Sequence, residues 1–474
     1  MLENPYQDLD ARIVGSICTT SRAYETVVEL CDRFGGRFAG TSEERRAAEF
    51  LVNQLRSAGL QDAAIEEFRY QGWRRGRPAK LTTLAPVKRS VPCLALPYCP
   101  PTDPKGLVAE MLDLGDGTPA DFEARSRDIP GRIVMVNSKP LLHLGRWVHR
   151  VEKYGRAVRA GACGFFFANH YDGLLPPTGA LRFGRRAEIP GVGLSKEHAS
   201  VLSRSARQAA VRVRLVTMDE FITATGCNVL ASLPGSNRRD CILVGAHFDA
   251  HDIAEGADDN ASGVAAVLEA VRAIAAARPS LRRTIRVAFW SAEEIGLLGS
   301  RAYVQKHRDE LKHIRLYFNV DSLPAGRAKG IVTCGWPQFA PFLHRVARQI
   351  AYPLPFADQV NAHSDHYTFF LRGVPAVSLG NLEKLPEGRG FGHTAADTTD
   401  KVDSRDVQEA AAVLARLLVR FADAQHWPLT HRSRTWAVKH LHAVGLAEAM
   451  RLELSPPFDD ISTARKHGKS RGHT

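Results

Sequence analysis

The sequence lacks any apolar run long enough to cross a membrane, and it lacks the pattern of a secretion signal. A spanning helix needs about 18 consecutive apolar residues. The longest apolar stretches, such as ACGFFFAN at 162–169, are short enough to be buried strands. The N-terminal segment MLENPYQDLDARIVGS has no basic region followed by an apolar core. We therefore expect a cytoplasmic protein without a membrane partner.

Paired cysteines and nucleic-acid motifs are also missing. The eight cysteines are scattered through 474 residues with no Cys-x-x-Cys pair, which predicts buried free thiols. The net charge of +12 is spread over many arginines, and no recognition motif accompanies it, so we expect no nucleic-acid partner. With 44% hydrophobic and 24% charged residues, the composition is that of a globular protein. It leaves self-association, for example as a homo-oligomer, open.

The order of predicted elements divides the chain into four parts. Within the first part, residues 1–90, we expect helices over residues 20–60 and then a loop and a strand. Ser42 is the expected N-cap of a helix that stops at Gly59. Dense proline marks a boundary, after which residues 91–220 form a smaller, β-rich inserted domain. Residues 221–425 alternate apolar strands with helices, which predicts an α/β domain with a mixed, mostly parallel sheet sandwiched by helices. Residues 426–474 form an extension whose basic end, ARKHGKSRGHT, we expect to be disordered.

Acidic and histidine residues follow successive predicted strands of the α/β part. CILVGAHFD ends on His247 and Asp249, TIRVAFWSA leads to Glu293 and Glu294, and IRLYFNVDS ends on Asp321. VPAVSLGN leads to a loop that holds His393 and Asp397. Ligands of open α/β sheets bind beyond the carboxyl ends of the strands. We therefore expect these side chains to converge at one edge of the sheet and to hold divalent metal.

The types of side chain favour zinc. Imidazoles combined with carboxylates suit Zn²⁺ better than Mg²⁺ or Ca²⁺, which prefer shells of oxygen alone. No cysteine is near, which argues against a closed structural site. Two histidines and three carboxylates exceed the needs of one tetrahedral ion with an open position, but they suit two ions that share a bridging carboxylate.

These motifs resemble those of the co-catalytic di-zinc exopeptidases, a family of aminopeptidases. The family's motifs occur in its usual order as HFD, GADDNASG, EEIG, NVDS and HTAADT. The resemblance covers roughly residues 221–425 and the segment GGRFAGTSEERRAAEFLVNQLRSAGL near the start. Residues from about 95 to 220, IPGVGLSKE above all, look like the protease-associated domain that is often inserted between these two parts.

The resemblance implies a role for each matching residue. Asp259 would bridge two zinc ions, His247 and Asp321 would complete the shell of one, and Glu294 and His393 that of the other. Glu293 would be the general base that takes a proton from a zinc-bound water and passes it to the leaving amine. Asp249 would lie behind the ligands and orient the imidazole of His247.

Each motif taken alone has a plainer interpretation. An acid pair such as Glu293 and Glu294 is usually a solvated loop, and the acids of DDNASG could merely favour a helix N-terminus. Their occurrence together, in family order and on successive strand ends, favours the metal site. His251, His363 and His366 match no ligand position, and we expect them and Asp365 to be structural or to support the ligands. Some relatives stabilise the oxyanion with a Tyr that this chain lacks before SDHYTFF; Asn361, His363 or zinc could take its place.

The sequence thus predicts a zinc-dependent exopeptidase that removes N-terminal residues from peptides through a hydroxide bound to two zinc ions. A carboxypeptidase or dipeptidase of the same fold is the alternative among peptidases. A glutaminyl-cyclase-like acyltransferase, which typically holds a single zinc, and a non-catalytic binding protein are the alternatives outside them. The preferred side chain and the natural substrate stay open.

Overall fold

The computed structural model describes residues 4–323, 328–380, 382 and 391–458. Within these limits the chain forms two compact units. Unit 1 comprises Met1–Arg69, Thr225–Lys384 and Asp397–Val444, and unit 2 comprises Tyr70–Ala224, Leu385–Ala396 and Gly445–Thr474. The basic end ARKHGKSRGHT lies outside the described residues, so its predicted disorder stays a prediction. The domain limits predicted from the sequence also stay predictions.

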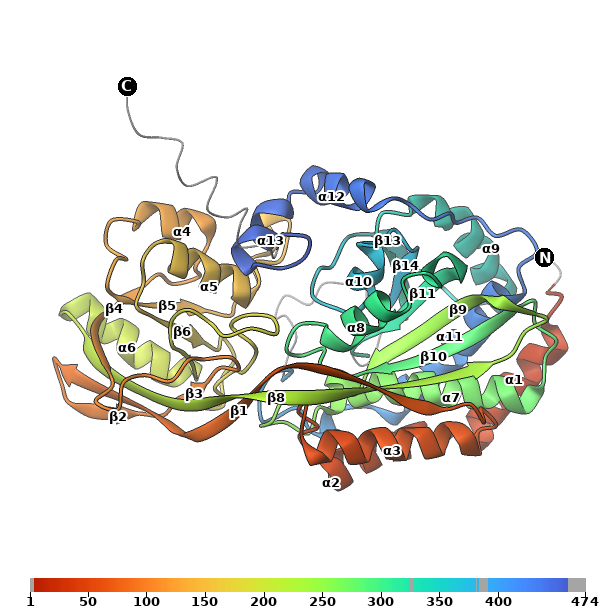
Figure 1. The fold of residues 1–474 in the computed structure, drawn as a ribbon, viewed down its shortest axis with the longest axis horizontal. Coiled ribbons are helices and arrows are strands. Elements are labelled where there is room, and N and C mark those ends of the chain that lie inside the picture. Colours follow the sequence, from red (N-terminus) through yellow and green to blue (C-terminus); the bar gives the residue numbers. More distant parts are fainter. Residues whose placement is uncertain (1–3, 324–327, 381, 383–390, 459–474) are drawn as a thin grey trace. The chain divides into compact units, whose positions relative to one another are not determined.

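The sheet of unit 1 is mixed and mostly parallel (Figure 1). Its strands lie in the order β13-β12-β14-β11-β9-β10-β8, and β14, β11, β9 and β10 run parallel to one another. The strands are β8 (Arg212–Leu233), β9 (Asn237–His247), β10 (Arg283–Trp290), β11 (Ile314–Val320), β12 (Gly330–Thr333), β13 (Phe356–Asp358) and β14 (Ala376–Gly380). The four predicted apolar strands therefore form the centre of this sheet.

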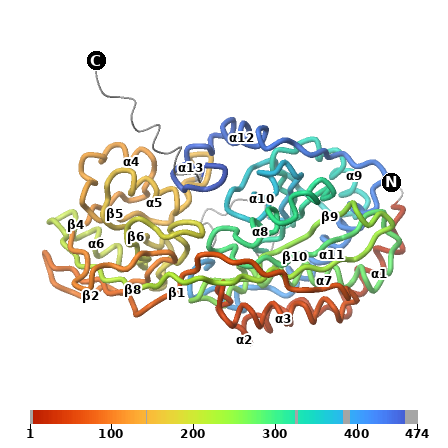
Figure 2. Tube along the Cα trace, viewed as in Figure 1, coloured from red at the N-terminus to blue at the C-terminus, as the bar shows by residue number. Residues whose placement is uncertain are grey.

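Helices cover both faces of the sheet, as the predicted fold class requires. The helices of unit 1 are α1 (Gln7–Thr20), α2 (Ala23–Phe34), α3 (Ser42–Ser57), α7 (Ser262–Ala277), α8 (Leu298–Lys306), α9 (Ala340–Ile350), α10 (His366–Phe370), α11 (Ser404–Asp423) and α12 (Arg434–Ala443). Figure 2 shows α1 beside α7 and α11, although these helices are far apart in the sequence. Helix α7 and helix α11 contact β9, and α10 contacts β11 and β14.

Side chains of β9 that point to opposite faces of the sheet are buried on both faces. Cys241 and Leu243 pack with Trp290, Tyr303 and Phe369 in one apolar cluster. Ile242 and Val244 point to the opposite face and are fully buried as well. An apolar residue at every position of a strand is typical of a parallel sheet that is covered on both sides.

Unit 2 has a core of its own. It contains the first part of β8 and most of β1 (Ala64–Ala85), two strands that extend into unit 1. Its other strands are β2 (Arg89–Val91), β3 (Leu94–Ala95), β4 (Leu107–Asp113), β5 (Ile133–Asn137), β6 (Gly164–Ala168) and β7 (Gly191–Leu194). Its helices are α4 (Pro119–Ala124), α5 (Arg150–Arg159), α6 (Lys196–Gln208) and α13 (Ala447–Glu453). Strands β4 to β7 pair in parallel, and two clusters of buried apolar residues fill the space around them. Short 3₁₀ turns complete the described parts at Leu142–Leu144, Leu311–His313, Pro337–Phe339 and Thr399–Lys401.

The N-cap of α3 is Thr41, and the prediction of Ser42 was wrong by one residue. The Thr41 side chain accepts a hydrogen bond from the N–H of Glu44, three residues along. The Glu44 carboxylate accepts in turn from the N–H of Gly40 at 2.6 Å. The Thr41 hydroxyl thus caps the helix, whereas Ser42 lies inside the helix and bonds to Glu43. Gly59 has a φ of +99° just past the helix, as expected of a helix stop.

One helical stretch, Ala257–Ala277, has the length and composition of a membrane span. It contains α7 and the single irregular turn Ala257–Ala261 before it. In its most apolar window 83% of the residues are buried inside the protein, as in a core helix. Among the described residues no other helix meets the same criteria.

Candidate metal centre

Three neighbouring strands of unit 1 bring the predicted side chains to one edge of the sheet. His247 is the last residue of β9 and is aligned with Trp290, the last residue of β10. Glu293 and Glu294 follow β10 after a short turn, and Asp321 directly follows β11. Parallel strands end on the same side of a sheet, so these residues meet where the sequence predicts.

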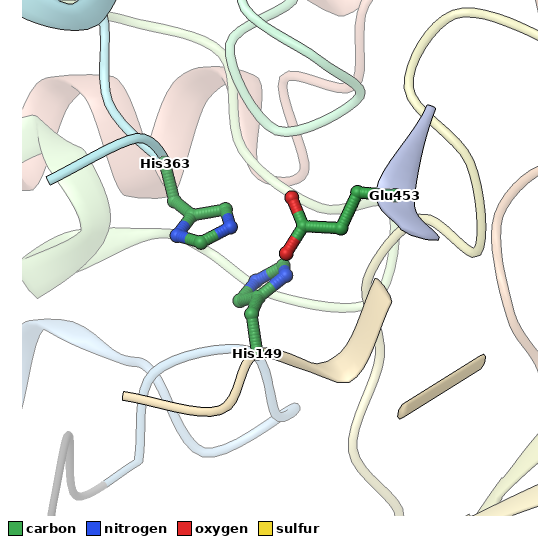
Figure 3. A group of neighbouring side chains, drawn as sticks. All are labelled: His149, His363 and Glu453. Carbon is green, nitrogen blue, oxygen red and sulfur yellow. The ribbon is translucent and has the colours of Figure 1, made fainter. Parts of the chain in front are cut away.

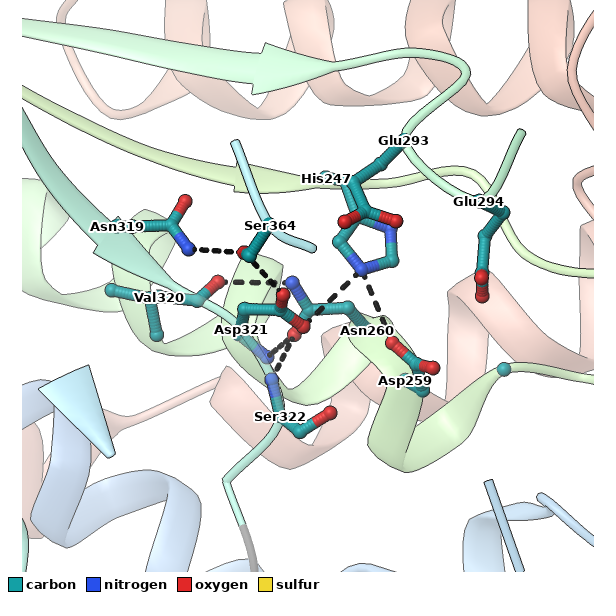
Figure 4. Close-up of polar contacts among 12 residues, drawn as sticks. His247, Asp259, Asn260, Glu293, Glu294, Asn319, Val320, Asp321, Ser322 and Ser364 are labelled. Carbon is teal, nitrogen blue, oxygen red and sulfur yellow. Dashed lines mark hydrogen bonds and ion pairs between the residues drawn. The ribbon is translucent and has the colours of Figure 1, made fainter. Parts of the chain in front are cut away.

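His247, Asp259 and Asp321 form the first group of possible ligands. Nε2 of His247 lies 3.1 Å from Oδ1 of Asp259 and 3.4 Å from Oδ1 of Asp321, and the ligand atoms of all three lie within 4.8 Å of one another. Ligand atoms around a tetrahedral Zn²⁺ lie about 3.4 Å apart, because its bonds are about 2.1 Å long. The three residues therefore fit one zinc ion, and their side chains face a common region in Figure 4.

His251 and Glu294 are the unit 1 members of the second group of possible ligands. Within unit 1, Nε2 of His251 lies 3.0 Å from Oε2 of Glu294, and both side chains are buried. His393 belongs to the segments of unit 2, with a φ of +61° and a carbonyl that accepts from the N–H of Thr178 at 2.8 Å. The role of His393 as a zinc ligand therefore stays a prediction of the sequence. The ligand types of this group also suit zinc.

Asp249 connects the ends of β9 and β10. Its carboxylate accepts hydrogen bonds from the backbone N–H groups of Glu293, at 3.1 Å, and Glu294, at 3.3 Å. Nδ1 of His247 lies 3.5 Å from Oδ1 of Asp249 and 3.2 Å from its backbone carbonyl. Asp249 is fully buried and thus lies behind the imidazole and the acid pair at once.

Negative charge is concentrated at this edge. Burial would by itself lower the pKa of His247, but Glu293 and the carboxylates of Asp249, Asp259 and Asp321 raise it well above its usual value. Burial also raises the pKa of Glu293, and Asp321 and Glu294 raise it further, while His247 opposes the rise. The raised pKa values of His247 and Glu293 both show that the site favours an added positive charge. Among the described residues, the two ligand groups contain Glu294 but not Glu293.

Hydrogen bonds fix the segment that carries Asp259. The carboxylate of Asp397 accepts from the backbone N–H groups of Asp258, at 2.8 Å, and Asp259, at 3.2 Å. The next side chain, Asn260, donates to the carbonyl of Val320 and accepts from the N–H groups of Gly263 and Ser322 (Figure 4). Asn260 thereby joins the turn before α7 to the end of β11, where Asp321 lies.

Asp321 is held by side chains that the sequence did not single out as functional. The Ser364 hydroxyl donates to Oδ2 of Asp321, and Nδ2 of Asn319 donates to Ser364 at 2.7 Å (Figure 4). This leaves Oδ1 of Asp321 facing His247. The motif SDHYTFF is the signal that could have identified Ser364, since its first residue makes this contact.

The other histidines and Asp365 lie in different surroundings. His366 is buried with Nδ1 3.4 Å from Nδ2 of Asn319, and burial lowers its pKa to about 4. Burial raises the pKa of Asp365 to about 7. His363 belongs to unit 1, whereas His149 and Glu453, which are drawn with it in Figure 3, belong to unit 2. We therefore assign no site to these three residues.

Comparison with known proteins finds peptidases among the relatives of this chain. Residues 228–418 match Peptidase family M28. Aminopeptidase YwaD of Bacillus subtilis is 27% identical over 419 residues, which are 86% of this chain and 86% of that protein. Carboxypeptidase Q of Homo sapiens is 27% identical over 418 residues, 85% of this chain and 86% of that protein. The crystal structure of a peptidase M28 precursor from Shewanella amazonensis matches with a TM-score of 0.76 and 25% identity, over 90% of this chain and 98% of that one.

The α/β fold and the ligand cluster at its strand ends define a metallopeptidase, a hydrolase of peptide bonds. More narrowly, residues 228–418 are similar to peptidase family M28, and most of them lie in unit 1. The resemblance predicted from the motifs, the α/β fold class and the enzyme class are therefore confirmed.

Proposed function

We propose that this chain is a zinc-dependent exopeptidase that removes residues from the N-terminus of peptides. The observation that carries the proposal is the convergence of His247, Asp259 and Asp321 at distances that suit one zinc ion. Glu294 and His393 would bind a second ion, with Asp259 shared between the two. His251 contacts Glu294 and would support this second ion.

Glu293 would act as the general base. Bound zinc would polarise the scissile carbonyl and lower the pKa of the attacking water. Glu293 would accept the proton of that water and deliver it to the leaving amine. Asp249 supports this role, because it holds the backbone of both glutamates and so keeps Glu293 apart from its metal-binding neighbour.

The charge of the site favours the N-terminal end of a substrate. The two relatives compared above are named an aminopeptidase and a carboxypeptidase, and they are equally similar to this chain. When ionised, the five carboxylates of Asp249, Asp259, Glu293, Glu294 and Asp321 carry one negative charge more than the four positive charges that two divalent ions would bring. An excess of negative charge attracts an α-ammonium group and repels an α-carboxylate.

The experiment compares three versions of one short peptide, with free termini, with an acetylated N-terminus and with an amidated C-terminus. We expect cleavage of the free and the amidated peptide, release of the N-terminal residue, and little cleavage of the acetylated one. Release of the C-terminal residue from the acetylated peptide would overturn the aminopeptidase proposal in favour of a carboxypeptidase.

Metal content tests the zinc assignment separately. We expect about two zinc ions per chain by elemental analysis, and loss of activity after removal by a strong chelator. Readdition of Zn²⁺ should restore activity. Full activity in protein that contains no metal would contradict the assignment.

We also propose that residues 91–220 form an inserted domain similar to protease-associated domains, between peptidase segments 1–90 and 221–425 and ahead of the extension 426–474. The separate apolar clusters around β4 to β7 support this division. A cytoplasmic location and the absence of membrane and nucleic-acid partners stay predictions of the sequence.

A further inference from the structure

A buried arginine holds the backbone on which the first ligand group is built. Arg37 is 0% exposed and follows helix α2 closely. Its guanidinium donates hydrogen bonds to five backbone carbonyls. The acceptors are Phe248 (2.8 Å), Leu30 (3.1 Å), Gly35 (3.0 Å), Glu255 (2.6 Å) and Gly256 (3.0 Å).

Three of these carbonyls lie in the metal-binding loop, which we define as residues 247–261. Phe248 lies between His247 and Asp249, and Glu255 and Gly256 precede Asp259 by three or four residues. The backbone carbonyl of Arg37 also accepts from the N–H of Ala250 in the same loop. The other two acceptors lie at the end of α2, so Arg37 ties both ends of the loop to this helix.

A second buried residue, Asp397, holds the same loop through its backbone N–H groups. The Asp397 carboxylate accepts from the N–H groups of Asp258 and Asp259, directly after the carbonyls that Arg37 binds. Between the two charges the chain passes through Gly256 at a φ of +61°. A side-chain carbon at Gly256 would lie 2.4 Å from Cβ of Ala250 and 2.8 Å from the carbonyl oxygen of Asp259. The loop therefore has little room for another shape.

We propose that Arg37 is a positioning residue that shapes the metal-binding loop before metal binds, so that His247 and Asp259 are held at ligand spacing. This inference rests on the proposed metal-dependent function. Burial of a cation is costly unless its donors are satisfied, and here five backbone carbonyls satisfy them. Lysine keeps the charge, but its three donors on one nitrogen cannot span five carbonyls.

The test is Arg37→Lys, with Arg283→Lys as the matched control. Arg283 is buried and also donates to three backbone carbonyls, those of Phe421, Ala422 and Ala424, away from the loop. Zinc affinity is measured by competition with a chromogenic chelator, and the folding of the metal-free protein by circular dichroism and thermal melting. We expect Arg37→Lys to bind zinc about 10- to 100-fold more weakly, as for other residues that orient ligands. Added zinc should restore much of its turnover.

A second pair of variants tests the loop without changing a charge. Gly256→Ala should weaken zinc binding through the overlaps described above. Gly59→Ala is its control, because Gly59 also has a positive φ but no atom within 4 Å of the added carbon. If Arg37→Lys fails to fold, Gly256→Ala decides the question.

The outcomes separate this inference from the proposed function. Wild-type zinc affinity in folded Arg37→Lys, or an equal loss in Arg283→Lys, would overturn the positioning role and leave the zinc peptidase intact. With Arg37→Lys unfolded, unchanged zinc affinity in Gly256→Ala would have the same meaning. Wild-type protein that hydrolyses peptides without binding zinc would overturn the proposed function and this inference together.

Discussion

Replacement of Glu293 by glutamine tests the central assignment of the site. The change keeps the size of the side chain and removes its ability to accept a proton. The backbone N–H of residue 293 can still donate to Asp249, so the turn after β10 should keep its shape. Among the described residues, neither ligand group includes Glu293, so metal binding should survive.

The expected loss in Glu293→Gln is large and confined to the chemical step. A positioned general base contributes about 10²- to 10⁴-fold, which corresponds to about 3–5 kcal/mol of transition-state stabilisation. We expect this loss in kcat with little change in KM, because proton transfer belongs to the transition state. Initial rates on an amino-acid anilide give both constants, and elemental analysis of the same sample gives the zinc content.

Glu294→Gln is the matched variant, since it makes the same change one residue along. Its side chain contacts His251 in the second ligand group, so this variant should lose zinc. If Glu293→Gln lost zinc and Glu294→Gln kept it, the two roles would be reversed. Full turnover in Glu293→Gln would refute general-base catalysis by this residue.

Three other substitutions test separate parts of the structure. Asp259→Ala should lose both zinc and activity, whereas the neighbouring Asp258→Ala should keep most of both; retention of two ions by Asp259→Ala in elemental analysis would contradict a bridging role. Burial raises the pKa of Glu44 from 4.5 to about 8, so its contribution to stability is complete below about pH 4.5 and is lost as the pH rises towards 8. From pH 5 to pH 8, the free energy of unfolding of Glu44→Gln should therefore rise by up to a few kcal/mol relative to that of the wild type. If the melting temperatures of variant and wild type differed by the same amount at pH 5 and at pH 8, this would be refuted. Phe369→Ala empties a fully buried position stacked 4.2 Å from the ring of Tyr317, and it should cost about 3–5 kcal/mol in urea unfolding; a cost below about 1 kcal/mol would contradict close packing there.

The α/β part of the fold could be predicted because its central strands are apolar at most positions. Segments such as CILVGAHFD and TIRVAFWSA predict a sheet that is covered on both faces. The structure places them side by side as β9 and β10. Helix α1 was missed, since its buried apolar contacts rest mainly on Ile13 and Ile17, too few for a clear helical pattern. The length of β1 was missed as well, because its residues are mostly polar and half-exposed.

The residues that converge on the site could be predicted, but most of their supporting contacts could not. His247, Glu294 and Asp321 stand at strand ends, and a rule about parallel sheets places them together. The contact of His251 with Glu294 depends on how the loop folds, which no spacing rule describes. Arg37 donates to backbone carbonyls. Because every residue has a backbone carbonyl, the sequence does not indicate which residues Arg37 contacts.

The double attachment of Asp249 complicates how mutants of this site can be interpreted. Its carboxylate lies near the imidazole of His247 and also accepts from the N–H groups of Glu293 and Glu294. Asp249→Asn would therefore disturb a ligand, the base and a second ligand at the same time. Its effect should be strongly non-additive with that of Glu293→Gln in a double-mutant cycle. A loss of activity in Asp249→Asn alone cannot be assigned to the orientation of histidine.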